Sequence, residues 1–385
     1  MISALGNDTP ENLAALQQGK SGISRLPFIE SKYSGVLPFG GISPATPELR
    51  DQMGVTASGV TRTSLLALHA FREAIADAQL TRQQVSMADT AVIDGTTVGG
   101  MCLTDEFYQD ATGNGIASPY LSRYDCASVS LFLQSEYGLQ GIINTINTAC
   151  SSSANAILYG ARLIRNGLAR RAIVGGTDSL SKITINGFNA LHILSDEYCL
   201  PFDRDRKGLN LGEGAAFLVI EKEEDLRGRK VWAELTGYCN STDAFHPSSL
   251  SAGGDGPALA MSGALQLSGL QPEQIGFINA HGTATGNNDE SESRAMIRVF
   301  GTVPPFGSTK SGTGHTLGAA GAIEAVYSIL SLKEQQMFPQ LRFSEPIPET
   351  GLRPETTLRP ADLQHVMSNS FGFGGNCTSL IFSKS

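Results

Sequence analysis

The chain has 385 residues, of which 41% are hydrophobic and 17% charged, and its formal net charge is −9. This length and composition suit a globular protein with one large core or two merged half-domains. The sequence has no apolar run long enough to cross a membrane, no secretory signal pattern and no run of basic residues. We therefore expect no membrane span, no secretion and no binding to nucleic acid.

The predicted elements alternate between helix and strand. The first part has a helix over 60–80, strands over 90–95 and 142–149, a helix over 151–168, and strands over 172–176 and 215–221. A charged stretch at 223–230 divides the chain into two parts, 1–226 and 227–385. The second part has strands over 231–239, 275–280, 366–370 and 377–382, and helices over 257–268, 288–300 and 316–334. This alternation predicts an α/β fold.

The six cysteines are scattered and form neither a Cys-x-x-Cys pair nor the spacing of a metal site. This usage is typical of reduced thiols in a cytoplasmic protein. Cys150 stands out because a β-branched run precedes it and a helix with small residues in its first turn follows it. Unpaired N–H groups and the positive end of the helix dipole converge at such a turn, which favours a thiolate and stabilises an oxyanion. Cys150 is thus a candidate nucleophile, and an inert buried cysteine is the alternative interpretation.

Two histidines lie in similar small, Gly-rich segments. His281 follows the predicted strand 275–280, and His315 lies at the head of the Gly/Ala-rich helix 316–334. A helix N-terminus disfavours imidazolium, so we predict that both histidines are neutral Nε2–H donors rather than general bases. The alternative for each is a structural histidine at the end of a loop.

Four motifs occur in the order and spacing of the elongating β-ketoacyl-acyl-carrier-protein synthases, which the chain resembles over essentially its whole length. They are Thr-Ala-Cys-Ser-Ser at 148–152, Asn-Ala-His-Gly-Thr at 279–283, Gly-His at 314–315 and Ser-Asn-Ser-Phe-Gly-Phe-Gly-Gly at 368–375. This family comprises Cys-His-His condensing enzymes. The resemblance implies a thiolase-like fold, with two similar halves stacked as five layers, α-β-α-β-α. The first half would carry the nucleophile and the second half both histidines.

The resemblance also implies a reaction, the decarboxylative Claisen condensation of malonyl-acyl carrier protein with an acyl group held as a thioester on Cys150. His281 and His315 would stabilise the enolate, and the backbone N–H groups of Cys150 and Phe373 the acyl-transfer oxyanion. Substrates would arrive on the 4'-phosphopantetheine of acyl carrier protein, with no further cofactor required. The family implies a homodimer with the strand before Cys150 as the edge, and a heterodimer with a homologous subunit is the alternative.

Further site residues are carried over from the family by position. Lys310 is expected to be a buried ammonium on the strand that enters the site, where it would position His315 and pair with Glu324. Phe371 and Phe373 would form an aromatic gate on a glycine hinge, and Thr283 and Thr285 would bind pantetheine. Arg62, Arg204 and Arg206 are candidates for carrier docking. Asn279, Glu324, Ser368 and Asn369 match positions that can hold a structural monovalent cation.

Polar residues occupy the positions that shape the acyl pocket in the family, namely Thr104, Asp105 and Cys126. Relatives that make saturated fatty acids are more apolar there. The sequence therefore leaves two pathways open, fatty-acid elongation and a type II polyketide or aryl-polyene ketosynthase of the same chemistry. We expect unsaturated, aromatic or oxygenated acyl groups to be favoured.

Other members of the superfamily fit the sequence less well. A degradative thiolase needs a second reactive cysteine in a Cys-x-Gly motif, whereas Cys377 stands in Gly-Gly-Asn-Cys-Thr at 374–378. A Cys-His-Asn synthase would lack His315, and a non-catalytic chain-length subunit would lack Cys150. One departure from the family is that only residues 1–4 precede the segment matched at 5–16. We therefore expect one strand to be absent or shortened, and a misassigned start codon is the preferred explanation.

Overall fold

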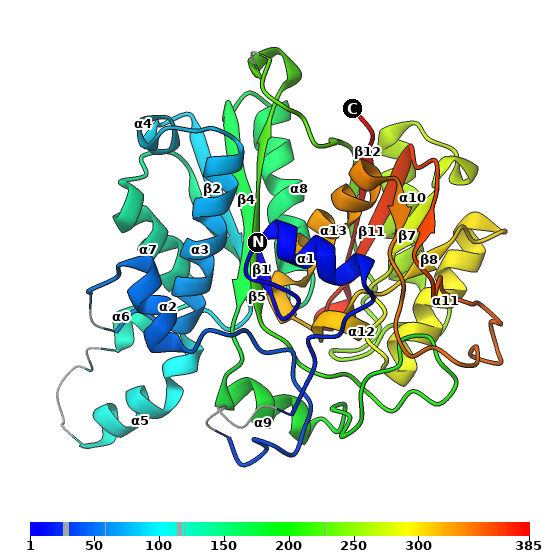
Figure 1. Cartoon of the computed structure of the whole chain (residues 1–385), viewed down its shortest axis with the longest axis horizontal. Coiled ribbons are helices and arrows are strands. Elements are labelled where there is room, and N and C mark those ends of the chain that lie inside the picture. The colour runs from blue at the N-terminus through cyan, green and yellow to red at the C-terminus, as the bar shows by residue number, and fades with distance from the viewer. Residues whose placement is uncertain (26–30, 58, 114–117, 119, 227) are drawn as a thin grey trace.

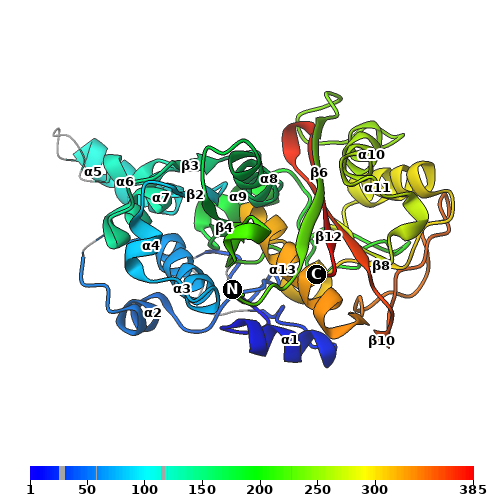
Figure 2. The same ribbon diagram turned by 90° about the horizontal axis from the view of Figure 1, so that it is seen from above.

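Two mixed five-stranded sheets enclose a pair of buried helices in the computed structural model of the chain (Figure 1). The structure describes residues 1–25, 31–57, 59–113, 118, 120–226 and 228–385. The central helices are α8 (Ser152–Arg165) and α13 (Ala320–Glu334), and each packs against strands of both sheets. Helices α3 (Arg62–Asp77) and α7 (Ser128–Tyr137) cover one outer face, while α10 (Asp255–Ser268) and α11 (Gly286–Phe300) cover the other (Figure 2). The predicted α-β-α-β-α layering is confirmed.

The two sheets have the same topology. The first has the order β1 (Ile2–Ser3), β5 (Gly214–Glu221), β4 (Arg171–Asp178), β2 (Thr90–Gly95) and β3 (Ile143–Ile146). The second has the order β6 (Glu234–Thr242), β12 (Asn376–Ser383), β11 (His365–Phe371), β7 (Phe277–Asn279) and β8 (Phe306–Gly307). In both, the first two pairings are antiparallel and the last two parallel. The chain thus folds as two copies of one unit.

The remaining elements are short and lie outside these layers. The α-helices are α1 (Thr9–Gln17), α2 (Thr46–Met53), α4 (Arg82–Ser86), α5 (Thr104–Gly113), α6 (Leu121–Tyr124), α9 (Lys182–Ala190) and α12 (Lys310–Thr313). The 3-10 turns are η1 (Met101–Leu103), η2 (Glu223–Asp225), η3 (Pro272–Gln274), η4 (Leu317–Ala319) and η5 (Phe373–Gly375), and β9 (Gln336–Met337) pairs with β10 (Arg359–Pro360). In the part of the chain that the structure describes, no helix combines the length and apolarity needed to span a bilayer.

The N-terminal strand is present but very short. Strand β1 has two residues, both buried, and pairs antiparallel with β5 at the edge of the first sheet. The boundary predicted between the halves falls at Arg227, which lies outside the described residues.

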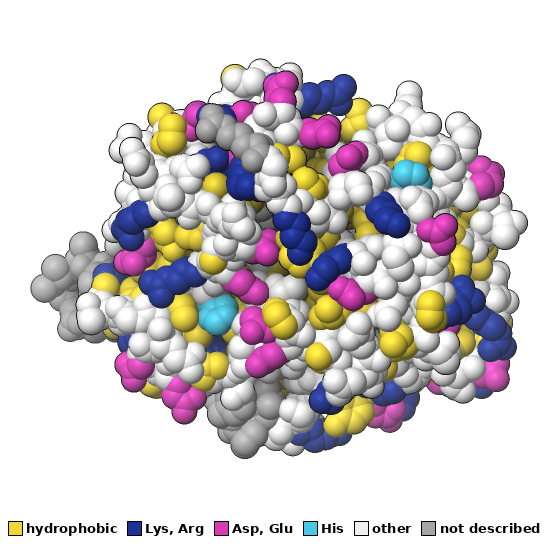
Figure 3. Space-filling model, turned by 45° about the horizontal axis from the view of Figure 1, so that its top comes forward, with side chains coloured by type: hydrophobic (Ala, Val, Ile, Leu, Met, Phe, Trp, Pro, Cys, Tyr) yellow, Lys and Arg dark blue, Asp and Glu magenta, His cyan; other side chains and the backbone are white. Residues whose placement is uncertain are grey.

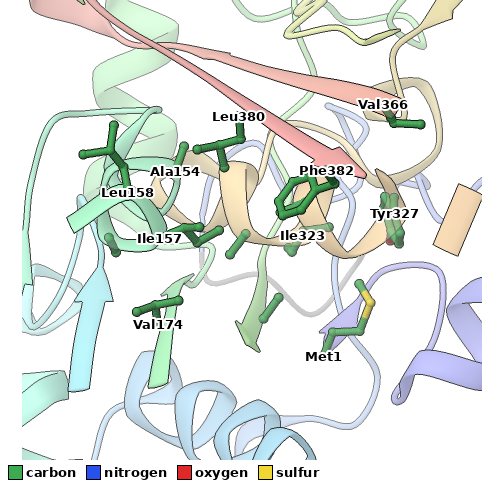
Figure 4. Close-up of a cluster of buried hydrophobic side chains, with 14 of the residues drawn as sticks. Met1, Ala154, Ile157, Leu158, Val174, Ile323, Tyr327, Val366, Leu380 and Phe382 are labelled. Atoms are coloured by element: carbon green, nitrogen blue, oxygen red, sulfur yellow. The ribbon is translucent and has the colours of Figure 1, made fainter. Parts of the chain in front are cut away.

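The main core lies between the sheets, where α8 and α13 cross (Figure 4). Ile157 and Leu158 of α8 join Ile323 of α13 and Leu380 and Phe382 of β12 in this cluster. Because the two helices approach closely, small residues occupy their contact. A Cβ added to Gly321 would lie 2.7 Å from both the Cβ and the backbone N of Ala154.

This contact generates a stability prediction. Gly321→Ala should lower the free energy of unfolding by about 1–3 kcal/mol, since helix backbones would have to separate to admit the methyl group. Gly187→Ala in α9 is the matched control, because a Cβ there meets no atom within 4 Å. The control should be neutral or stabilising by about 0.5–1 kcal/mol. Urea unfolding monitored by circular dichroism measures both, and an unchanged midpoint for Gly321→Ala would contradict the packing argument.

Candidate active site

Cys150 lies at the sharp turn between β3 and α8. Ala149 before it has a left-handed backbone (φ 54°), so the chain reverses within one residue. Side chains of α8 stabilise this turn, since the backbone N–H of Thr148 donates to Ser152 Oγ (3.0 Å) and Ser151 Oγ donates to the carbonyl of Thr148 (2.8 Å). The thiol is buried. The predicted placement of the thiol at a strand-to-helix turn is therefore correct.

The two histidines reach the same point from the second half of the chain. His281 follows β7, and its backbone N–H and that of Gly282 donate to the carboxylate of Glu292 (2.9 Å each). His315 precedes η4 and α13, and its backbone N–H donates to the carbonyl of Asn210 (2.7 Å). Both imidazoles are buried, their ring centroids are 5.4 Å apart, and the rings are nearly perpendicular at 86°.

Cys150, His281 and His315 form one compact group. One atom from each, the Sγ and a ring nitrogen of each imidazole, lie within 4.8 Å of one another. Thiol and imidazole are also zinc ligands. However, the Nδ1 of His315 accepts a hydrogen bond from the backbone N–H of Leu317 (3.2 Å), so its proton is on Nε2. A protonated nitrogen cannot bind a metal, and the arrangement suits hydrogen-bond donation instead.

Lys310 fixes the tautomer of His281. Its buried ammonium donates to the carbonyl of His281 (2.6 Å), contacts the Nδ1 of the same residue (3.3 Å), and forms an ion pair with Glu324. An ammonium group can only donate, so Nδ1 accepts and Nε2 carries the proton. The expectation that Lys310 positions His315 from a strand was wrong, since Lys310 begins the short helix α12 and its hydrogen bonds go to His281.

Burial controls the protonation of the group. It lowers the pKa of His281 and His315 well below the usual value, and the charge of Lys310 acts in the same direction. Both imidazoles are thus neutral, as expected. Burial also raises the pKa of the Cys150 thiol to about 11, although Lys310 and the backbone N–H groups of Phe373 and Cys150 oppose this. The expected resting thiolate was therefore wrong, because dehydration outweighs the field of the helix N-terminus.

The two phenylalanines of the predicted gate have different surroundings. Phe371 ends β11, is buried, and has its ring 5.8 Å from that of His281. Phe373 lies in the following turn η5, half-buried, with its ring stacked on Phe188 of α9 at 5.9 Å. The next residue, Gly374, has a φ of 82° and donates its N–H to the carbonyl of Pro247 (2.7 Å). Phe373 is thus the ring on the turn, and Phe371 packs against the site.

Thr283 and Thr285 lie beside the site and share a hydrogen bond (2.9 Å). Arg206 donates to the carbonyls of Thr285 (3.3 Å) and Gly286 (2.9 Å), so it lies beside these threonines. Arg204 is 53% exposed and pairs with Asp205.

Arg62 was wrongly placed among the docking residues. It makes a bidentate ion pair with the buried Glu213 (2.7 and 2.9 Å) and is itself only 15% exposed. On the face shown in Figure 3, basic and acidic side chains are interspersed.

The polar residues expected in the acyl pocket also have different surroundings in the structure. Asp105 is 53% exposed on α5 and pairs with Lys182, so the expectation that it points inward was wrong for the single chain. A carboxylate in the first turn of an exposed helix stays hydrated and finds a basic partner at the surface. Thr104 donates to the carbonyl of Met101 (2.5 Å), and Cys126 accepts from the side chain of Asn147 (3.5 Å).

Three of the four residues expected at a cation site offer free oxygens. Asn279 Oδ1, Glu324 Oε2 and Ser368 Oγ are buried and have no hydrogen-bond partner among the described residues. Such a set of carboxylate, amide and hydroxyl oxygens fits a hard monovalent cation. Asn369 differs, because its Oδ1 accepts from Ser379 Oγ (2.8 Å) and its Nδ2 faces Glu292 (3.3 Å).

Sequence reasoning missed Glu292, which holds the backbone of His281 and Gly282. Burial raises the pKa of this carboxyl group to about 7. A signal was available, because Glu292 lies on the buried face of α11 with Asp289, Ala295 and Met296. A carboxyl group on the apolar face of a helix indicates a specific buried partner.

Two family models match the chain, the β-ketoacyl synthase N-terminal domain over residues 1–226 and the C-terminal domain over residues 232–344. The 3-oxoacyl-(acyl-carrier-protein) synthase 2 of Synechocystis sp. is 32% identical over 399 residues, which cover 100% of this chain and 96% of that protein. The protein of the same name from Staphylococcus aureus is 32% identical over 401 residues, with the same coverage.

Two solved structures are also similar over the whole chain. The ishigamide ketosynthase/chain length factor superimposes with a TM-score of 0.91 at 30% identity, covering 100% of this chain and 97% of that one. The ketosynthase ApeO in complex with its chain length factor ApeC, from Xenorhabdus doucetiae, superimposes with a TM-score of 0.85 at 33% identity, covering 100% and 96%.

The raised pKa of Cys150 predicts how its reactivity depends on pH. Below a thiol pKa of about 11, the thiolate fraction grows about tenfold per pH unit. The rate of iodoacetamide alkylation at Cys150 should therefore still be rising between about pH 8 and pH 10. Mass spectrometry of the Cys150 peptide after timed alkylation measures this rate. A plateau below pH 8 would show that the resting group is a thiolate.

Proposed function

This chain belongs to the β-ketoacyl synthase family, and we propose that it lengthens acyl chains on acyl carrier protein by decarboxylative Claisen condensation, with Cys150 as the nucleophile. The observation that carries this assignment of residues is the convergence of one thiol and two neutral imidazoles within 4.8 Å in a buried site. A thiol alone can accept an acyl group. Two fixed Nε2–H donors beside it can also stabilise an enolate.

Acyl loading is the first half-reaction. The Sγ of Cys150 attacks the carrier thioester, a new C–S bond forms, and the pantetheine sulfur leaves with the thiol proton. The backbone N–H groups of Cys150 and Phe373 both lower the pKa of the Cys150 thiol, so they lie near Sγ. They are therefore placed to donate to the oxyanion that develops one bond away from it. Because Phe373 lies on a turn with Gly374, its ring is the candidate gate to the acyl pocket.

Condensation is the second half-reaction. The malonyl thioester loses carbon dioxide, and the Nε2–H groups of His281 and His315 donate to the enolate oxygen. The enolate carbon then attacks the acyl carbon on Cys150, the C–S bond breaks, and the sulfur regains a proton. Neutral imidazoles suit this role, since Lys310 holds His281 as an Nε2–H donor and the Leu317 N–H does the same for His315.

Residues around Cys150, His281 and His315 also bear on how the carrier binds and how the subunits assemble. We assign pantetheine contacts to Thr283 and Thr285, with Arg204 and Arg206 as the nearby basic residues that would meet an acidic carrier. We further propose a dimer formed through β3, which is the half-exposed edge of the first sheet. Both solved structures named above contain a ketosynthase and a chain length factor, so a heterodimer is the alternative to a homodimer.

A monovalent cation is assigned to the free oxygens of Asn279, Glu324 and Ser368. These residues lie on β7, α13 and β11, so a bound cation would join three elements of the second half. Its charge would offset the buried carboxylate of Glu324, which burial otherwise drives toward the protonated form with a pKa of about 7. The role is structural.

Substitutions of Cys150, His281 and His315 test the roles proposed for them in the two half-reactions. Cys150→Gln should abolish condensation and leave decarboxylation of malonyl-acyl carrier protein intact, because the histidines serve that step without the thiol. His281→Ala and His315→Ala should each slow decarboxylation on the order of a hundred- to a thousandfold, the usual effect of removing an oxyanion donor. His365→Ala is the control, since that histidine lies at the opposite end of β11 and bonds Ser383. Release of labelled carbon dioxide measures the step, and normal release by either site variant would refute enolate stabilisation.

A polyketide or polyene ketosynthase is the second candidate function. It is favoured by the likeness to the ishigamide and ApeO–ApeC ketosynthase/chain length factor structures, at 30% and 33% identity against 32% for the 3-oxoacyl synthase. The polar residues Thr104 and Cys126 near the expected acyl pocket support it, while Asp105 no longer does. The intact group at Cys150 argues against a non-catalytic chain-length subunit.

Competitive acyl loading separates the two pathways. A polar group left without a partner against a saturated chain costs about 1–3 kcal/mol, which is roughly tenfold in rate for each ~1.4 kcal/mol. We therefore expect a polyenoyl or aryl carrier to acylate Cys150 about tenfold faster than a saturated carrier of equal length. Mass spectrometry of the acylated Cys150 peptide gives the ratio. Preference for the saturated chain would assign the protein to fatty-acid elongation.

A further inference from the structure

Asp178 is a fully buried residue at the end of β4 that the proposed reaction does not use. Its Oδ1 accepts hydrogen bonds from Thr96 Oγ1 (2.6 Å) and the backbone N–H of Val98 (2.9 Å). Its Oδ2 accepts from Thr97 Oγ1 (2.6 Å) and the backbone N–H of Gly318 (2.6 Å). The backbone N–H of Thr97 approaches both oxygens, at 3.2 and 3.0 Å. Every partner is a donor.

These hydrogen bonds join the two halves of the chain beside the catalytic group. Residues 96–98 follow β2 in the first half, whereas Gly318 belongs to η4 in the second. The neighbouring Leu317 donates its N–H to His315 Nδ1. Leu317 has a φ of 56°, a left-handed conformation that a branched side chain disfavours, so this turn needs support from outside. The hydrogen bond from Gly318 to Asp178 supplies that support one residue away.

The donor pattern indicates that Asp178 is ionised. Backbone N–H groups cannot accept a proton from a carboxyl group, and three of them face the two oxygens. The hydroxyl of Thr96 accepts from the backbone N–H of Gly99 (3.0 Å), which leaves its own proton for Asp178. The other buried aspartate nearby, Asp94 on β2, is the opposite case. Both of its oxygens lack a hydrogen-bond partner among the described residues.

We propose that Asp178 is a positioning residue for decarboxylation: its carboxylate fixes the η4 turn so that the Leu317 N–H holds His315 as an Nε2–H donor. This inference rests on the proposed function, because it concerns the histidine that meets the enolate. Asp178 touches neither Cys150 nor His315 directly, so it acts through the turn. It also couples this turn to residues 96–98.

The same carboxylate has an electrostatic effect on the nucleophile. Its negative charge contributes to the raised pKa of Cys150, while the positive charge of Lys310 opposes it. Removing the charge of Asp178 should therefore make the thiol easier to ionise. The two consequences run in opposite directions, since His315 loses its orientation while Cys150 becomes more reactive. General loosening of the fold would impair the decarboxylation without a shift in the pH profile of the thiol.

Asp178→Asn tests the proposal in the full-length protein. Decarboxylation of malonyl-acyl carrier protein should fall by about tenfold or more in kcat with little change in KM, since the substrate contacts remain. Iodoacetamide alkylation of Cys150 at pH 8 should rise severalfold, with its pH profile displaced to lower pH. Asp94→Asn is the matched control for a buried carboxyl-to-amide change and should move neither measurement. Unchanged decarboxylation in Asp178→Asn, or slower alkylation, would overturn the proposal.

A second variant and a spectroscopic measurement guard against a folding defect. Thr97→Val keeps the carboxylate but removes one donor, so it should slow decarboxylation while leaving the pH profile of alkylation in place. Ring ¹⁵N shifts of labelled His315 report the tautomer directly, and Thr97→Val should lose part of the Nε2–H signature. A wild-type shift pattern in that variant would count against positioning. If the wild-type protein itself released no carbon dioxide, the proposed function would fail. If the wild-type protein released carbon dioxide and both variants released it at the same rate, only the role of Asp178 would be refuted.

Discussion

The ammonium group of Lys310 lies fully buried between His281 and Glu324, and the chemistry of the site depends on it. A buried charge is costly unless it is paired and hydrogen-bonded, and this one has a carboxylate, a carbonyl and an imidazole nitrogen around it. Burial lowers the pKa of His281, the charge of Lys310 acts in the same direction, and the contact of the ammonium with Nδ1 leaves the proton of His281 on Nε2. The same charge also opposes the rise in the pKa of Cys150. One cation thus acts on the pKa of both imidazoles and of the thiol, although burial has the larger effect on each.

The repeat in the fold explains how these residues meet. In each half the third strand leads into the central helix, as β3 leads to α8 and β8 leads to α13. Cys150 lies on the first of these connections and His315 on the second. Because α8 and α13 pack against each other at Ala154 and Gly321, the segments before the two helices lie close together. Equivalent positions in two copies of one unit therefore supply Cys150 and His315.

Burial favours one half of the reaction and opposes the other. Dehydration keeps the imidazoles neutral, which suits hydrogen-bond donation to an enolate. It also keeps Cys150 a thiol at rest, so loading depends on donors that act once the acyl group is in place. The backbone N–H of Phe373 is the donor proposed above, and it lies in the turn η5. The proposed gate and the proposed oxyanion donor therefore belong to one residue, whose ring stacks on that of Phe188.

The sequence by itself determined the types of element, the turn at Cys150, the neutral state of the histidines and the family, because periodicity and short motifs are local properties. The family resemblance also pointed to three residues whose oxygens fit a cation. Only the tertiary structure decided which groups share a contact. Lys310 donates a hydrogen bond to His281 rather than to His315, Arg62 forms an ion pair with Glu213, and Asp105 is at the surface. The common topology of the two sheets was implied by the family resemblance and not by residue spacing, and the high pKa of Cys150 was not foreseen. Pairing partners far apart in the chain, and the loss of water that their packing causes, are set by the whole fold and not by any local pattern.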